Sequence, residues 1–381
     1  MTAARGRLHA EAADAPAPRI DFQGGGAFYG ELKLRVKAVI DEPGRARRAQ
    51  TRMYVKSAVM VLWAVGSWAL LVFAAETWWA AGLLALSLGL ALAGVGFNIT
   101  HDANHGSYSP HRRLNRALCW SLDAIGASSH VWQVKHNTAH HTFTNVSGAD
   151  SDIDSMPFAR LAPDQPRRPY HRFQHVYMWF LYGLFAMKWH TLGDFGYLRQ
   201  GRVGQVPLPW PRGRKLMGFW LGKTLFATWA LVIPLLLHPL WEVIAVFAVV
   251  SFVLAFTLAV TFQLAHCVEE AEFTSVEEMA AAGSSEWARH QIETTVDFAP
   301  RNPVLAWYLG GLNFQVEHHL FSRVCHTHYP AMAAVVREVC DRHSIRHQSH
   351  PGLWPALVSH ARWLRRMGQK AKEPRGEEPV T

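Results

Sequence analysis

The stretch that decides the fold reads His101-Asp102-Ala103-Asn104-His105 and, after thirty further residues, His136-Asn137-Thr138-Ala139-His140-His141. Residues four apart lie on one face of a helix, so His101 and His105 can point at one place, and His136 and His140 repeat the spacing. Much later in the chain stands Gln315-Val316-Glu317-His318-His319. Neighbouring helical residues point about 100° apart, so a pair such as His318 and His319 can serve two adjacent centres.

These histidines form a candidate metal site. Neutral imidazole is a suitable ligand for iron, zinc, copper and nickel. The seven histidines at helical spacing or in adjacent pairs, together with His266 after a later apolar run, exceed what one four-coordinate zinc ion can use. A single histidine pair is often a plain surface feature, but three such clusters in one chain favour a site for two metal ions.

Four apolar runs set the fold class. They cover residues 57–79, 80–99, 218–238 and 240–263 of a 381-residue chain that is 50% hydrophobic. Each run of about 20 residues can cross the ~30 Å hydrocarbon layer of a bilayer as a helix. We therefore expect an all-α integral membrane protein with four transmembrane helices in two hairpins, the first run closed by Trp78 and Trp79 at the interface.

Charge predicts the orientation of these hairpins. Basic residues precede the first run, whereas the hairpin turns contain no Lys or Arg, which places the turns on the translocated side. Both termini and all histidine clusters are then cytosolic, in a helical cap at the membrane surface. The net charge of +9 fits anionic lipids or acidic partners. Nucleic-acid binding is not expected, because no recognised motif is present and the basic residues flank apolar runs.

The remaining segments fit around this core. Residues 1–28 are rich in Ala, Pro and Gly and are expected to form a disordered tail without a signal peptide. Residues 29–345 form the expected main domain, which holds the apolar runs and the histidine clusters, and residues 346–381 a helix and charged tail. The aromatic segment 173–190 contains polar residues and is expected to lie on the interface or the core rather than to span the membrane. The four cysteines show no metal-binding spacing.

The three histidine motifs, HDANH, HNTAHH and QVEHH, resemble the three histidine boxes of membrane fatty acid desaturases. Their order, the intervening apolar runs and the extra histidine after the fourth run also match, over about residues 50–345. The resemblance implies two non-haem irons, molecular oxygen and a cis double bond inserted into an acyl-CoA or acyl-lipid. The implied iron ligands are His101, His105, His136, His140, His141, His266, His318 and His319.

The third box begins with Gln315, where many members of the family have histidine. This substitution resembles front-end or linoleoyl-type desaturases, which act between an existing double bond and the carboxyl end. Many of those enzymes carry a fused haem domain with an HPGG motif, but Ser349-His350-Pro351-Gly352-Leu353 lacks the second glycine. The chain also has no flavin or nicotinamide fingerprint, so electrons are expected from an external ferredoxin or cytochrome with its NAD(P)H reductase.

Further polar residues are candidates around the metals. Histidines bound to metals usually donate their second N–H to a carboxylate or carbonyl. The acids of the boxes can accept such a hydrogen bond, and so can Asp150, Asp152 and Asp154. The alternative for these last three is a solvated acidic loop. Possible ligands or orienting residues are Asp102, His290, Gln315 and Glu317. By resemblance, Trp132, Asn145 and Gln291 lie near the substrate tunnel. A basic surface for the electron donor, or for lipid headgroups, is offered by Arg112, Arg113, Arg116, Arg167 and Arg168.

Two alternatives remain open from the sequence. A related diiron membrane hydroxylase acting on alkanes, sterols or carotenoids would use a similar histidine set. A metal transporter or receptor-like membrane protein is the other, but transporters place polar ligands inside the spans, whereas here the histidines follow them.

Overall fold

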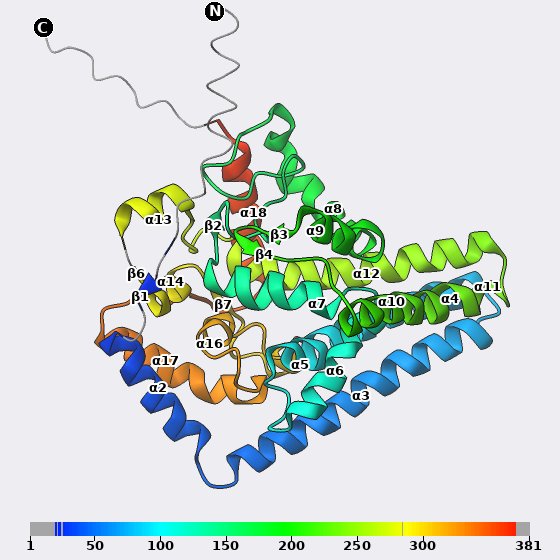
Figure 1. Ribbon diagram of the computed structural model, residues 1–381, viewed down its shortest axis with the longest axis horizontal. Coiled ribbons are helices and arrows are strands. Elements are labelled where there is room, and N and C mark those ends of the chain that lie inside the picture. The colour runs from blue at the N-terminus through cyan, green and yellow to red at the C-terminus, as the bar shows by residue number, and fades with distance from the viewer. Residues whose placement is uncertain (1–19, 21, 24–25, 284, 371–381) are drawn as a thin grey trace, which may run out of the picture.

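Four long helices extend side by side from a cap of shorter ones (Figure 1). The computed structural model describes residues 20, 22–23, 26–283 and 285–370. The long helices are α3 (Arg45–Phe73), α4 (Trp78–Val95) continued by η1 (Gly96–Thr100) and α5 (His101–His105), α10 (Arg214–Ala227) continued by η5 (Thr228–Val232) and α11 (Ile233–Leu235), and α12 (Leu240–His266). Each of the four is long and apolar enough to cross a membrane, as predicted.

The structure corrects the ends of the first two runs. The first helix ends at Phe73, and Trp78 and Trp79 begin the second helix instead of closing the first. Thr77 sets this start, because its side chain accepts a hydrogen bond from the amide of Ala80. The second helix does not end at residue 99 but continues through a π-helical turn to His105. Such turns are frequent at functional sites.

The outer faces of the long helices are apolar. Leu62 is 72% exposed, Leu240 62% and Ile244 56%. Buried side chains on their inner faces pack together, including Met60, Leu88 and Leu254. An apolar exterior around an apolar interior is expected of helices that contact lipid.

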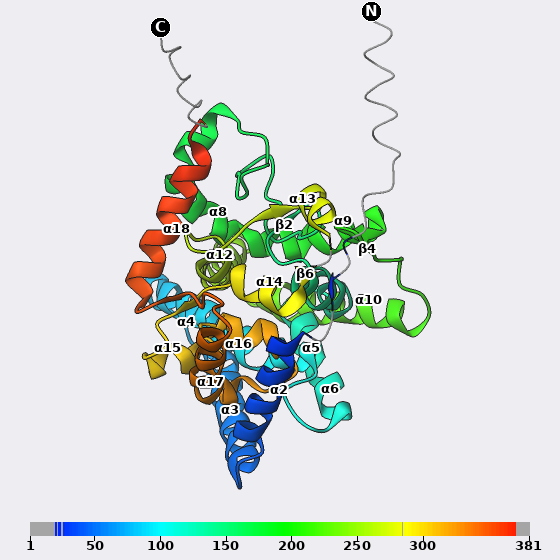
Figure 2. The same ribbon diagram turned by 90° about the vertical axis from the view of Figure 1, so that its left-hand side faces the viewer.

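The cap surrounds the ends of α3, α5 and α12 opposite the hairpin turns (Figures 1 and 2). Its second apolar core joins α2, α14, α16 and α17, with buried residues such as Ile292 and Val336. The cap helices are α2 (Ala27–Ile40), α6 (Arg112–Ala124), α7 (Ser129–Trp132), η2 (Gln133–His140), η3 (Pro169–Phe173), α8 (Gln174–Lys188), η4 (Trp189–Gly193), α9 (Asp194–Gln200), α13 (Val276–Ala282), α14 (Trp287–Glu293), α15 (Pro303–Tyr308), α16 (Gln315–Leu320), η6 (His326–His328), α17 (Tyr329–Arg342) and α18 (Leu353–Gly368).

The aromatic segment predicted not to span the membrane forms α8, which packs against α12. Gly183 allows the close approach, because a Cβ there would lie 2.1 Å from the ring of Phe252. With 15 residues, α8 is not among the four helices that are long and apolar enough to cross a membrane.

Among the described residues, three short strand pairs join segments of the cap that are far apart in the sequence, and a fourth pair is a local hairpin. β1 (Phe22–Gln23) pairs with β6 (Ser285–Glu286), so the expected disordered tail to residue 28 is too long, and Phe28 is buried in α2. Residues 1–19 and the charged end 371–381 lie outside the described residues. The remaining pairs are β2 (Val146–Ser147) with β5 (Thr274–Ser275), β3 (Arg202–Val203) with β4 (Val206–Pro207), and β7 (Asp297–Phe298) with β8 (Ser349–His350).

Candidate metal centre

The three histidine motifs and His266 meet where the long helices join the cap. His101 and His105 lie on α5, the last turn of the second long helix, and His266 ends α12. The second motif lies on η2 and the residue after it, and the third motif forms α16. All eight histidines are buried, none being more than 8% exposed.

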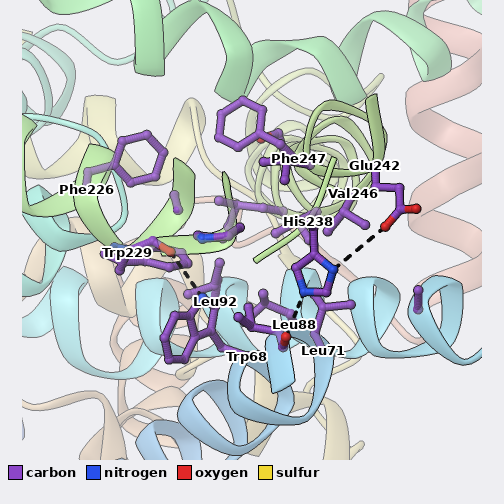
Figure 3. A pocket seen from close by; sticks show the side chains of 18 of the residues that line it. Trp68, Leu71, Leu88, Leu92, Phe226, Trp229, His238, Glu242, Val246 and Phe247 are labelled. Atoms are coloured by element: carbon purple, nitrogen blue, oxygen red, sulfur yellow. Dashed lines mark hydrogen bonds and ion pairs between the residues drawn. The ribbon is translucent and has the colours of Figure 1, made fainter. Parts of the chain in front are cut away.

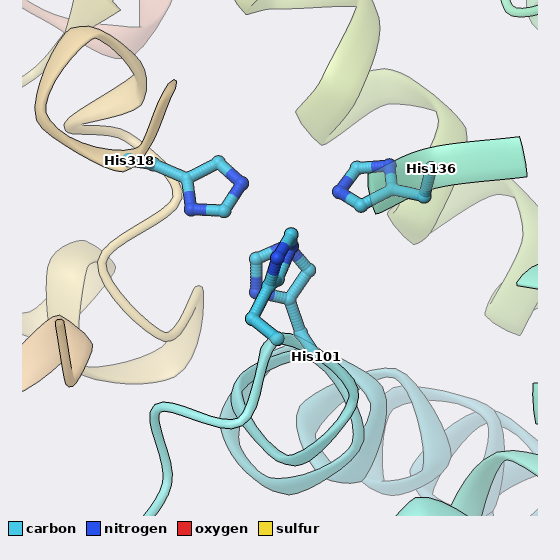
Figure 4. Close-up of side chains that lie close together, drawn as sticks. His101, His136 and His318 are labelled. Atoms are coloured by element: carbon cyan, nitrogen blue, oxygen red, sulfur yellow. The ribbon is translucent and has the colours of Figure 1, made fainter. Parts of the chain in front are cut away.

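A first cluster contains His101, His105, His136 and His318. One ring nitrogen of each lies within 4.8 Å of those of the others. Figure 4 shows the rings of His101, His136 and His318 directed toward a common centre. Both ring nitrogens of His101 and the Nε2 atoms of His105 and His318 have no hydrogen-bond partner among the described residues.

A second cluster contains His140, His266 and His319, again with ring nitrogens within 4.8 Å of one another. His141 lies between the clusters, because it forms a third such set with His318 and His319. Its Nε2 lies 3.2 Å from Nε2 of His136. The adjacent pair His318 and His319 is thus divided between the two clusters, the geometry expected of neighbours on a helix.

The clusters favour neutral imidazoles. Burial, and then the neighbouring histidines, hold the pKa values of His136, His141, His318 and His319 well below their usual range. Burial also works against a charge on His140, but Asp150 raises the pKa of His140 above its usual value. Neutral imidazole is the form that binds metals.

Three side chains fix the orientation of these rings. Nδ1 of His140 lies 3.0 Å from Oδ2 of Asp150, and Nδ1 of His319 lies 2.8 Å from Oε1 of Gln291. Nδ1 of His318 lies 3.2 Å from the hydroxyl of Tyr329. When Nδ1 donates to such a partner, Nε2 carries the lone pair, so these contacts leave Nε2 available for a metal.

Gln315 borders the second cluster. Its Nε2 lies 3.0 Å from Nε2 of His266, and its Oε1 has no partner among the described residues. The glutamine that replaces histidine in the third motif therefore stands beside a candidate ligand, completely buried.

Asp102 turns away from the cluster toward a residue that sequence analysis did not single out. Its Oδ2 lies 3.0 Å from Nδ1 of His326, and its Oδ1 lies 3.7 Å from Nδ1 of His101. Lys56 lies 2.9 Å from the other ring nitrogen of His326. The only sequence signal for this chain of contacts is the histidine pair of His326-Thr327-His328 soon after the third motif.

Glu317 lies inside the third motif but is not a member of either cluster. Burial, and then Asp297, raise the pKa of Glu317 well above its usual value. Asp297 in turn accepts a hydrogen bond from the amide of Val316 at 3.0 Å. Glu317 is thus a buried residue of α16 on which Asp297 acts, and it belongs to neither histidine cluster. His290 is also outside the two clusters, with its ring 5.2 Å from that of Phe22.

The three acids after the second motif differ in their contacts and in their exposure. Asp150 contacts His140, and Asp152 forms an ion pair with Lys135 while lying 3.7 Å from Nδ1 of His140. Asp154 is exposed. Only the first two of the acids can orient a ligand.

The candidate tunnel residues take different places. Trp132 stacks on His136, with ring centres 4.3 Å apart, and so borders the first cluster. Asn145 has a positive φ of 56° and lies within 3.2 Å of the carbonyl oxygens of His266 and Thr294. It therefore joins the loop after the second motif to the end of α12.

The residues present fit two metal ions. Buried imidazole nitrogens without partners are costly, and two groups of them converge here. A set rich in histidine and free of cysteine suits iron better than a structural zinc site.

Comparison with known proteins agrees with this geometry. Residues 76–351 match the fatty acid desaturase family. The chain belongs to the fatty acid desaturase family. It is 37% identical over 346 residues to the sn-1 linoleoyl-lipid 6-desaturase of Arthrospira platensis, covering 89% of this chain and 92% of that relative.

Two further relatives support the same assignment. The sn-1 linoleoyl-lipid 6-desaturase of Synechocystis sp. is 34% identical, with 93% of this chain and 99% of the relative covered. The acyl-lipid (8-3)-desaturase of Physcomitrium patens is 34% identical, with 90% and 72% covered. This desaturase is thus an enzyme of lipid metabolism that introduces double bonds into fatty acyl chains, as the histidine motifs predicted.

Proposed function

We propose that this desaturase binds one iron ion in each histidine cluster and uses molecular oxygen to insert a cis double bond into a lipid-linked acyl chain. The two converging sets of buried imidazole nitrogens carry the proposal. When bound, iron supplies the oxygen activation needed to remove hydrogen from an unactivated carbon.

The ligands follow from the clusters. The first iron is assigned to the four histidines of the first cluster, and the second iron to the three of the second cluster, with His141 between them. Asp150, Gln291 and Tyr329 hold three of the rings by their Nδ1 atoms. Gln315 is assigned a positioning role at His266.

The position of the double bond is proposed from the relatives. Their names include 6-desaturases, (8-3)-desaturases and a Delta(5) desaturase, and these numbers lie near the carboxyl end of an acyl chain. The names of the 6-desaturases and of the (8-3)-desaturases specify lipid-linked substrates for those relatives. We therefore assign this chain front-end chemistry on an acyl-lipid.

An apolar cavity between the long helices offers room for the methyl end of such a chain. It has a volume of about 90 Å³ and is lined by residues such as Leu88, Leu92 and Trp229 (Figure 3). A hydrogen bond of 2.8 Å joins His238 to the carbonyl of Val72 in its lining. The cavity wall also includes Ile125, next to the cap.

Electrons are proposed to come from a separate protein. Reduction of oxygen to water takes four electrons, and the acyl chain supplies two, so a ferredoxin or cytochrome served by an NAD(P)H reductase must supply the other two. The arginines expected to bind the electron donor do not form one surface. Arg167 donates a hydrogen bond to the carbonyl of Gly368 at the end of α18. The helix α6, which carries the other candidate arginines, is well separated from α18 in both views (Figures 1 and 2). The exposed Arg112, Arg113 and Arg116 on α6 are therefore the proposed docking surface.

The cap, the metal centre and both termini are proposed to be cytosolic. The basic residues that precede α3 and the turns without Lys or Arg support this orientation. A reporter fused after Thr381 is expected to remain untranslocated, and a translocated reporter would contradict the orientation.

The experiment for the function is expression in a host of defined lipid composition, followed by location of new double bonds by mass spectrometry. Loss of two hydrogens at a position near the carboxyl end is expected, and His140→Ala, which removes a ligand, is expected to abolish the product. Gain of one oxygen would instead assign hydroxylation. Normal product from His140→Ala would refute the ligand assignment.

A further inference from the structure

A second pocket opens at the cap end of α3. It has a volume of about 720 Å³ and lies between α3 and the segment of α15 and η6. Its lining includes Arg52, Lys56, Arg301, Trp307 and His326.

The pocket is cationic. Its lining contains two arginines and a lysine but no aspartate or glutamate. In the described part of the chain, Arg52, Lys56 and Arg301 form no ion pair with a carboxylate. Lys56 is only 5% exposed, and its ammonium contacts a ring nitrogen of His326 and the face of Trp307. Lys56 reaches the buried carboxylate of Asp102 only through His326, and the exposed Arg52 and Arg301 have no carboxylate partner among the described residues, so the pocket keeps a net positive charge that favours a bound anion.

The pocket lies at the cap end of α3, one of the four helices long and apolar enough to cross a membrane. Exposed apolar side chains flank it, with Val55 60% exposed and Val304 76% exposed. Trp307, 44% exposed, is a residue type enriched at membrane interfaces. A cationic hollow bordered by apolar side chains matches a phosphate headgroup whose acyl chains lie along the apolar border.

The pocket also lies next to the metal centre. His326 in its wall contacts Asp102, the neighbour of His101 in the first cluster. Phe314, also in the wall, directly precedes Gln315. Front-end chemistry acts close to the carboxyl end of the acyl chain, so the headgroup of the substrate must be held near the metals.

We propose that this pocket binds the phosphate headgroup of a membrane phospholipid, and that the bound lipid carries the acyl chain to be desaturated. The second part rests on the proposed function. A hollow that encloses a buried lysine suits a headgroup better than the broad contact surface of an acidic electron donor, which α6 offers instead.

Binding without turnover tests the site. Short-chain phosphatidylglycerol, a short-chain galactolipid and inorganic phosphate are each titrated into the detergent-purified protein by calorimetry. The variant combines Arg52→Gln with Arg301→Gln, both at exposed positions, so the fold is expected to persist. The matched control is Arg47→Gln, an exposed arginine on the same helix outside the pocket lining.

Phosphatidylglycerol is expected to bind to the wild type and the control, and about tenfold or more weakly to the double variant, because charge-assisted contacts are lost. The conservative double variant Arg52→Lys with Arg301→Lys keeps both positive charges and should retain most of the affinity. Equal binding by the double variant, or equal binding of the galactolipid, would overturn the site. Inorganic phosphate binding as tightly as phosphatidylglycerol would overturn the lipid assignment. Displacement of bound phosphatidylglycerol by an added ferredoxin would also overturn it, because the pocket would then be the docking site of the electron donor.

The same variants separate the site from the proposed function. On vesicles, the double variant is expected to show a raised KM for phosphatidylglycerol with kcat retained, and an unchanged KM would overturn the substrate role. Lipid binding by a protein that forms no double bond would refute the proposed function and leave the phosphate site standing.

Discussion

Replacing Asp150 by asparagine perturbs the best-defined contact behind the metal centre. One carboxylate oxygen lies 3.0 Å from both Nδ1 of His140 and the amide nitrogen of Asn145, and the other lies 2.9 Å from the amide nitrogen of Asp152. Asparagine offers only one oxygen. In either orientation its NH₂ group faces a donor, and His140 loses the negative charge that orients its ring.

Two effects of known size follow. Loss of a residue that orients a metal-bound histidine typically lowers metal affinity by about 10–100-fold. A buried donor facing a donor costs about 1–3 kcal/mol, which should reduce the free energy of unfolding of the metal-free protein by that amount. Asp154→Asn, at an exposed acid of the same loop, is the control and should change neither quantity.

The assay is competition for ferrous iron against a chelator under anaerobic conditions, with denaturant unfolding of the metal-free protein in the same detergent. We expect a lower affinity for ferrous iron in Asp150→Asn and an affinity equal to that of the wild type in Asp154→Asn. If Asp150→Asn holds iron as tightly as the wild type, Asp150 does not orient a ligand, and the assignment of the second cluster loses its support.

Three further predictions concern other contacts. Gln291→Leu removes the acceptor of His319 and should lower iron content toward one ion per chain, as measured by elemental analysis; full occupancy would contradict the role of this contact. Gly183→Ala should lower the free energy of unfolding by about 1–3 kcal/mol through overpacking, whereas Gly196→Ala, with open space around it, should not. Burial raises the pKa of Asp123 to about 6, so the wild type loses stability as pH rises from 4 to 6. The variant Asp123→Asn should therefore be about 1–3 kcal/mol more stable to unfolding than the wild type at pH 8 and similar to it at pH 4. A variant that is less stable than the wild type at pH 8 would contradict this.

Sequence alone predicted the parts of this molecule that depend on local periodicity. The spacing of His101 and His105 follows from the helix, and the four apolar runs follow from length and composition. The division of His318 and His319 between two sets follows from the angle between helical neighbours.

Features that depend on contacts between distant segments could not be predicted. The contact of Asp102 with His326 joins residues far apart in the chain, and only the fold of the cap brings them together. The pairing of Phe22–Gln23 with Ser285–Glu286 also joins segments far apart in the chain. For this reason the sequence led us to expect a tail where the structure has a short strand. The end of the first span was misplaced because the capping role of Thr77 is a local detail that hydropathy does not resolve.

The most direct test of the two-iron account is the metal content and Mössbauer spectrum of protein expressed with ⁵⁷Fe and purified anaerobically. The account predicts two iron ions per chain, a spectrum of a coupled pair after oxidation, and loss of that pair in His141→Ala, whose ring lies between the clusters. One iron, a single zinc, or an unchanged coupled spectrum in His141→Ala would contradict it.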